Sequence, residues 1–118
     1  MKGDFEAMAR VLRRFAAERD WDQFHSPKNL AMALNVEAGE LLEHFQWLTP
    51  EQSQALPPDK LARVAEEIAD IQAYLVRIAD KLDVDILDAV ERKIRQNEAK
   101  YPADKVRGDA RKYDEYGD

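Results

Sequence analysis

The sequence predicts an all-α fold in which four main helices pack as a bundle. Apolar residues recur every three or four positions along most of the chain, which is the spacing of one face of an α-helix. Capping residues followed by proline mark several helix starts. No segment shows the alternation of apolar and polar residues that is typical of a half-buried strand. The pattern therefore favours helix packed on helix over any fold that contains a sheet.

The first two helices are expected over Asp4–Asp20 and from Ser26 through Trp47. Ser26 is a typical N-cap, and proline follows it at the first helical position. From Leu30 to Val36 the second helix is apolar on nearly every side, which predicts burial on all sides. Three short partner helices in a small monomer cannot cover so broad a surface, so the sequence predicts an oligomer.

The third and fourth helices are expected over Asp59–Leu82 and Asp85–Lys100, with the last one ending near Pro102. The stretch before them opens with a capping box at Thr49 but is cut short by two prolines, so we expect a connector there. The third helix has the strongest periodicity of the chain. Its apolar seam consists of Leu61, Val64, Ile68, Ile71, Leu75, Ile78 and Leu82.

Composition narrows the class of protein. The 118 residues are 45% hydrophobic and 36% charged, which predicts a single helical domain over 1–118 with a basic C-terminal tail at 101–118. The absence of cysteine excludes a disulfide framework, a thiolate nucleophile and a zinc finger, and the cytoplasm is the expected compartment. The sequence contains no long apolar run, so neither a signal peptide nor a membrane segment is expected. A net charge of −6 argues against binding to a nucleic acid polymer.

Two pairs of carboxylates carry the strongest functional signal. Glu37 and Glu40 on the second helix, and Glu67 and Asp70 on the third, are each spaced i,i+3, so each pair lies on one helix face. If the helices are antiparallel, the four side chains converge into an all-oxygen site suited to Mg²⁺ or Mn²⁺ and poorly suited to Zn²⁺ or Cu²⁺. The alternative is an ordinary solvated acidic face.

The same carboxylates limit the chemistry. A di-iron bundle uses Glu-x-x-His motifs, and neither histidine of this chain has a glutamate three residues before it. Mg²⁺-assisted chemistry on a phosphate ester or anhydride is the better hypothesis, with either Glu37 or Glu40 as the catalytic base. A hypothesis of another class is a non-catalytic helical interaction module whose acidic stripes bind a basic partner.

Basic residues near the C-terminus are candidates for phosphate contacts. On the fourth helix Lys93, Asn97 and Lys100 share a face, where they would contact phosphate or brace a carboxylate. The tail adds Arg107 and Lys112, and Gly108 would permit a bend over bound phosphates. The alternatives are ordinary surface lysines and a frayed, solvated terminus.

The order EAGE, EEIAD and KIRQNEAKYP resembles the MazG-like nucleoside triphosphate pyrophosphohydrolases, whose pattern is ExxE followed by ExxD on antiparallel helices. The stretches FAAERDWDQFHSPKNLAMAL, FQW, DIQAYLV and RGDARKY are most similar to the dCTP pyrophosphatase branch. The resemblance implies a four-helix MazG-like bundle completed by oligomerisation into a homotetramer, a dimer of dimers. It also implies Mg²⁺-dependent hydrolysis between the α and β phosphates, with Glu37, Glu40, Glu67 and Asp70 as metal ligands.

Recognition of a nucleobase requires a slot with aromatic walls and a few polar groups. In the resembled branch, the residues matching Trp21, His25, Trp47 and Tyr74 surround the base. Trp47 and Tyr74 are also explained as fillers of a core or an interface. The resemblance implies a preference for dCTP or related modified deoxynucleotides, and the alternative is the same reaction on another pyrimidine or a damaged nucleotide.

Overall fold

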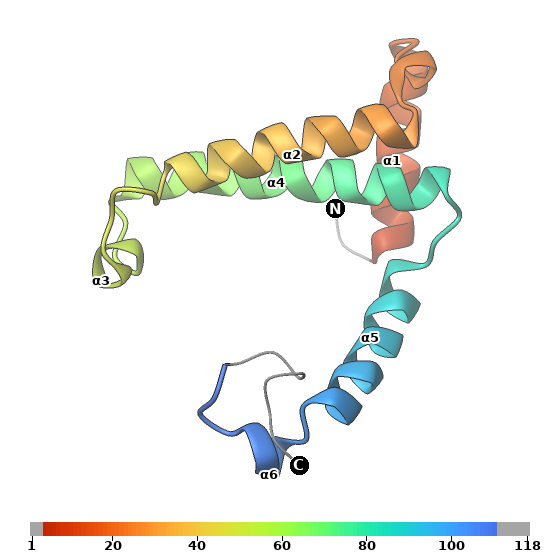
Figure 1. Ribbon diagram of the computed structural model, residues 1–118. Coiled ribbons are helices and arrows are strands. Elements are labelled where there is room, and N and C mark those ends of the chain that lie inside the picture. The colour runs from red at the N-terminus through yellow and green to blue at the C-terminus, as the bar shows by residue number, and fades with distance from the viewer. Residues whose placement is uncertain (1–3, 111–118) are drawn as a thin grey trace. The chain divides into compact units, whose positions relative to one another are not determined.

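The computed structural model describes residues 4–110, and their helices agree with the predicted all-α class (Figure 1). No strand occurs in this range. Four long helices match the four that the sequence predicts, and short helical turns join or follow them. In chain order the elements are α1 (Phe5–Glu18), the 3₁₀ helix η1 (Asp22–Phe24), α2 (Pro27–Glu43), α3 (Pro50–Ser53), α4 (Pro58–Lys81), α5 (Ile86–Lys100) and α6 (Ala103–Val106).

Side-chain caps explain where several of these helices begin. The Ser26 hydroxyl accepts a hydrogen bond from the Asn29 amide at 3.1 Å, and Pro27 occupies the first helical position as predicted. Thr49 and Gln52 form the expected reciprocal capping box at the start of α3. Asp85 caps α5 through the Asp88 amide at 2.9 Å.

Two predicted helix ends are wrong by a few residues. The first helix ends at Glu18 and not at Asp20, because Asp20 adopts the left-handed conformation with φ of 53°. The second helix ends at Glu43 and not at Trp47. There the backbone amides change to the closer i−3 carbonyls, as in the 2.9 Å bond from the Phe45 amide to the Leu42 carbonyl, which tightens the chain into a turn.

Contacts divide the chain into two units, Met1–Val84 and Asp85–Asp118, and each is described by itself. In the first unit α2 and α4 run side by side in opposite directions, and α1 packs against α4 (Figure 1). Alanines at two turns of α1 are buried, which lets its backbone approach α4 closely. The buried apolar residues are Ala9, Ala16, Leu30, Val64, Val76 and Ala79.

The predicted apolar seam of α4 divides into two stripes. Val64 is buried, and Ile71 and Ile78 are half-buried. The other stripe is 44–56% exposed and repeats every seven residues: Leu61, Ile68, Leu75 and Leu82. The seam is therefore only partly covered within one chain, while the neighbouring residues Val76, Arg77 and Ala79 are buried.

The second unit contains α5 and α6. The apolar positions of α5 (Leu87, Val90 and Ile94) are each about half exposed. After α6, Gly108 has φ of 77°, a left-handed conformation that glycine adopts without steric cost. Within residues 4–110, no helix is long and apolar enough to cross a membrane.

Candidate functional site

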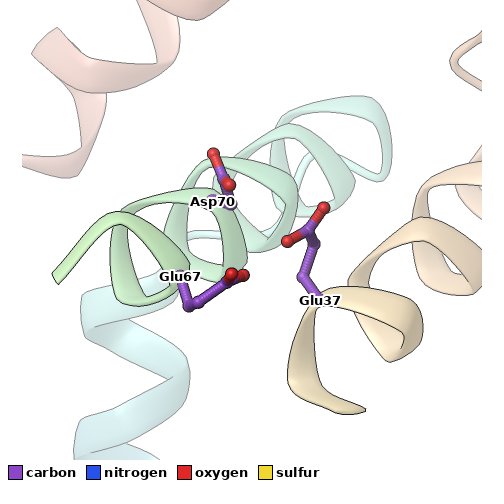
Figure 2. Close-up of side chains that lie close together, drawn as sticks. All are labelled: Glu37, Glu67 and Asp70. Atoms are coloured by element: carbon purple, nitrogen blue, oxygen red, sulfur yellow. The ribbon is translucent and has the colours of Figure 1, made fainter. Parts of the chain in front are cut away.

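The antiparallel pair α2 and α4 brings carboxylates from two distant parts of the sequence together. Figure 2 shows Glu37 on α2 facing Glu67 and Asp70 on α4. One carboxylate oxygen from each of these three residues lies within 4.8 Å of the other two. The predicted convergence is thus present for three side chains, which we call the acidic cluster.

Glu40 interacts with the acidic cluster, although it lies outside the closest group of three. Hydrogen bonding with Glu37, followed by the charge of Glu37, raises the pKa of Glu40. The pKa of Glu37 is itself raised, first by hydrogen bonding with Glu67 and then by burial. Both glutamates thus hold a proton more tightly than usual, because the site concentrates negative charge.

Two oxygens of the acidic cluster lack the partners that buried polar atoms normally have. Glu37 Oε2 and Glu67 Oε2 are buried and accept no hydrogen bond within the part of the chain that the structure describes. His44 Nε2 lies 3.9 Å from Glu67 Oε1, a contact that becomes an ion pair only when the imidazole is protonated. Carboxylate oxygens are the ligands that Mg²⁺ and Mn²⁺ prefer, so this set of donors fits a divalent cation.

The residues predicted to surround a base lie at opposite ends of α2. Trp21 and His25 flank η1 immediately before the helix, whereas Trp47 lies in the turn after it. The 17 residues of α2 span roughly 25 Å. One chain therefore does not bring Trp21 and His25 into the same slot as Trp47.

The environments of these aromatic residues also differ. Trp47 is 87% exposed, so it does not fill the core of this chain. Trp21 is 46% exposed and makes an edge-to-face contact with Phe15 at 5.8 Å between ring centroids. Tyr74 is half-buried on α4, one turn after the acidic cluster. Trp47 and Trp21 thus keep free ring surface that a base could contact.

The sequence prediction missed the surroundings of His25. Arg77 lies on α4 and is 4% exposed, the one buried charged residue among those that the structure describes. Its Nη2 donates to Asp22 Oδ1 at 3.0 Å and contacts His25 Nδ1 at 3.2 Å. The only sequence signal is that Arg77 follows Tyr74 by three residues, which places both on one helix face. The placement of η1 against α4 depends on tertiary packing, which the sequence does not show.

The candidate phosphate contacts belong to the second unit or lie outside the described residues. Lys93, Asn97 and Lys100 are exposed on α5, and Arg107 follows α6. Lys112 falls outside residues 4–110. The roles of these five residues stay predictions.

The chain belongs to the MazG-like family, whose model matches residues 32–116. This finding confirms the resemblance seen in the sequence. Among curated relatives, dCTP pyrophosphatase 1 of Mus musculus is 46% identical over 110 residues, which cover 92% of this chain and 65% of that protein. The Homo sapiens protein of the same name is 45% identical over 112 residues, covering 93% of this chain and 66% of its own. The chain thus spans slightly less than two thirds of these relatives.

A solved structure supports the same family relationship. A pyrophosphatase from Archaeoglobus fulgidus superposes with a TM-score of 0.74 and 38% sequence identity. The match covers 86% of this chain and 95% of that one. Because the superposition covers most of both chains, the similarity includes the arrangement of the helices as well as the sequence.

Proposed function

We propose that this chain is a Mg²⁺-dependent nucleoside triphosphate pyrophosphohydrolase. It cleaves between the α and β phosphates, gives the monophosphate and pyrophosphate, and prefers dCTP or a related modified deoxynucleotide. The observation that carries this proposal is the convergence of Glu37, Glu67 and Asp70 with two buried oxygens that lack partners. The identity to dCTP pyrophosphatase 1 supports the choice of substrate. We propose that the reaction removes unwanted or modified nucleotides, and that it takes place in the cytoplasm, the compartment that the composition favours.

Glu37, Glu40, Glu67 and Asp70 would hold the metal, with Mn²⁺ as a possible substitute for Mg²⁺. When bound, the ion neutralises phosphate charge and lowers the pKa of a coordinated water. A net acidic protein thereby accommodates a polyanionic substrate. Either Glu37 or Glu40 would orient the attacking water and accept its proton.

We further propose that the chain acts as a homotetramer, a dimer of dimers. The exposed stripe Leu61, Ile68, Leu75 and Leu82 has the seven-residue repeat with which helices of two copies pack together. Association would also bring the base-binding residues of one copy close to those of another, which the length of α2 prevents within a single chain. Trp21, His25, Trp47 and Tyr74 would then line a slot shared between copies.

The basic residues of the second unit would contact the phosphates. Lys93 and Lys100 recur with Asn97 on one face of α5, so they present donors together. We assign them, with Arg107 and Lys112, to phosphate binding or to bracing the metal-binding carboxylates.

The activity is tested with a panel of nucleotides and Mg²⁺, followed by separation of the products by ion chromatography. The panel contains dCTP, 5-methyl-dCTP, dTTP, dUTP, dATP and dGTP. We expect equal amounts of dCMP and pyrophosphate from dCTP, and no reaction after chelation of the metal. Release of orthophosphate without pyrophosphate would contradict the mechanism, and a stronger reaction with another pyrimidine would correct the substrate. Heavy-oxygen water identifies the phosphorus attacked by the position of the label.

The oligomer is tested with Leu61→Glu, which places a charge in the exposed stripe of α4. We expect this variant to have a smaller mass by light scattering than the parent chain. Ala62→Glu is the matched control, because Ala62 is exposed and lies one position away from the stripe. A parent chain that is monomeric at micromolar concentration would contradict the proposed tetramer.

A further inference from the structure

The contact between Arg77 and His25 determines more than the position of the ring. Arg77 Nη2 lies 3.2 Å from His25 Nδ1, at a guanidinium that is 4% exposed. Arginine remains charged at every physiological pH and has only donors. His25 Nδ1 must therefore accept this hydrogen bond, and the proton of the neutral imidazole must be on Nε2.

The other ring nitrogen is left available. Within residues 4–110, His25 Nε2 has no hydrogen-bond partner, while the His25 backbone amide is used by the Asp22 carbonyl at 3.0 Å. His25 is half-buried, so its ring is fixed by packing and by Arg77 but is still accessible in part. The arrangement presents a single N–H donor of known chemical identity.

We propose that Arg77 is a positioning residue that holds His25 as the neutral Nε2–H tautomer, and that this N–H donates to an acceptor atom of the nucleobase. This inference rests on the proposed function, which places His25 beside the base. The inference adds that Arg77 fixes the tautomer of His25, and that the ring therefore recognises a hydrogen-bond acceptor and not a donor. A base atom that is itself a donor would be rejected, because the two donors would oppose each other.

The charged groups around His25 support this assignment. Arg77 and Lys81 face it from α4, and Asp22 faces it from η1. Burial lowers the pKa of His25, the positive charge of Arg77 lowers it further, and Asp22 acts in the opposite direction. Protonation would place a proton on Nδ1, directly against the guanidinium. His25 therefore stays neutral at pH 7 and keeps one tautomer.

The tautomer is measured by nitrogen NMR of the histidine rings in the full chain. The chain has two histidines, so the spectrum of His25→Gln assigns the remaining signals to His44. In the parent we expect an unprotonated Nδ1 and a protonated Nε2 at His25. Arg77→Met should give a mixture of tautomers and a higher pKa of His25. Arg13→Met is the matched control, because Arg13 pairs with Asp80 in the same network without contacting His25.

Binding measurements separate the base from the phosphates. Arg77→Met should weaken binding of dCMP by about two- to tenfold, which is the loss expected for one hydrogen bond, and leave binding of Mg²⁺-pyrophosphate unchanged. Arg13→Met should change neither. Equal weakening for pyrophosphate would mean that His25 contacts phosphate and would overturn the base assignment.

The parent spectrum decides the first half of the proposal even if Arg77→Met does not fold. A proton on Nδ1 of His25 in the parent would overturn it. Arg77→Lys is the second variant, because an ammonium is also only a donor and should preserve the Nε2–H tautomer. A parent that binds no dCMP would refute base donation and the proposed substrate class together, while the tautomer still tests the role of Arg77.

Discussion

Two groups of charged side chains lie on α4. In one group each charge is paired with an opposite charge, and in the other negative charges face one another. Near the C-terminal end of α4, each charge that faces α1 and η1 has a partner of opposite sign. Asp80 receives two hydrogen bonds from Arg13 at 2.7 and 3.0 Å, and Arg77 donates to Asp22. The acidic cluster lies closer to the start of the same helix. There the carboxylates face one another, and among the described residues the only basic side chain in salt-bridge range of them is His44, whose Nε2 lies 3.9 Å from Glu67 Oε1.

The difference separates a charge-balanced network, which includes Arg77 beside His25, from a candidate metal site. The balanced network joins α1 and η1 to α4 through directional bonds, so it stabilises the fold without any ligand. In the acidic cluster, burial of like charges opposes folding until a cation or a proton neutralises them. A cation from solution would relieve this repulsion, as the proposed function requires.

Removing one ligand of the acidic cluster should have the largest effect. Glu67→Gln keeps the size of the side chain but removes a charge and a metal ligand, so we expect pyrophosphate release to fall by about 10²- to 10⁴-fold. The measurement is the initial rate with dCTP across a range of Mg²⁺ concentrations. Glu66→Gln is the matched control, because Glu66 is exposed on the same helix outside the cluster. An equal loss of activity in both variants would show that the acidic cluster has no special role in the reaction.

Removing a carboxylate from the balanced network should affect stability and not chemistry. Asp80→Asn leaves the buried Arg77 with one fewer negative partner, and we expect the free energy of unfolding to fall by about 1 to 2 kcal/mol at pH 7. Hydrolysis per folded molecule should be unchanged. The control is Asp59→Asn, which removes an exposed charge paired with Arg63 in the first turn of α4 and should lower the stability less than Asp80→Asn does.

The same variant has a defined pH dependence. Hydrogen bonding from Arg13 is the main cause that lowers the pKa of Asp80 below its ordinary value of 3.8, and burial opposes it. A lowered folded-state pKa contributes stability that is complete above 3.8 and is lost as the pH falls through the folded-state value. The difference between the parent and Asp80→Asn, measured by denaturant unfolding, should therefore shrink below this pH. A difference that grows in acid would show that Asp80 is not stabilised by its cations.

Relief of repulsion within the acidic cluster should have the smallest effect. Without divalent ions, Asp70→Asn should have the melting temperature of the parent or one about 1 to 3 °C higher. Mg²⁺ should then stabilise the parent more than the variant, because binding to the folded state shifts the unfolding equilibrium. Thermal melts with and without Mg²⁺ measure both effects. A lower melting temperature of the metal-free variant would indicate that basic partners already neutralise Asp70.

Much of the fold was predictable because its signals are local. The predicted caps at Ser26 and Thr49 depend on residues within one turn, and both occur in the structure. The carboxylate pairs were predictable for the same reason, since i,i+3 spacing places both members on one face. The end of α2 was not, because the tight turn beginning at His44 lacks a glycine or proline that would mark it.

The sequence by itself determined the helices, the paired carboxylates and the resemblance to the MazG-like family, because these depend on short-range spacing and on residue type. Tertiary structure decided which stripe of α4 is covered, which oxygens of the acidic cluster lack partners, and that Arg77 is buried against His25. Such facts depend on how helices that are far apart in the chain are aligned. Periodicity shows that a helix has an apolar face, but only packing shows what lies against it.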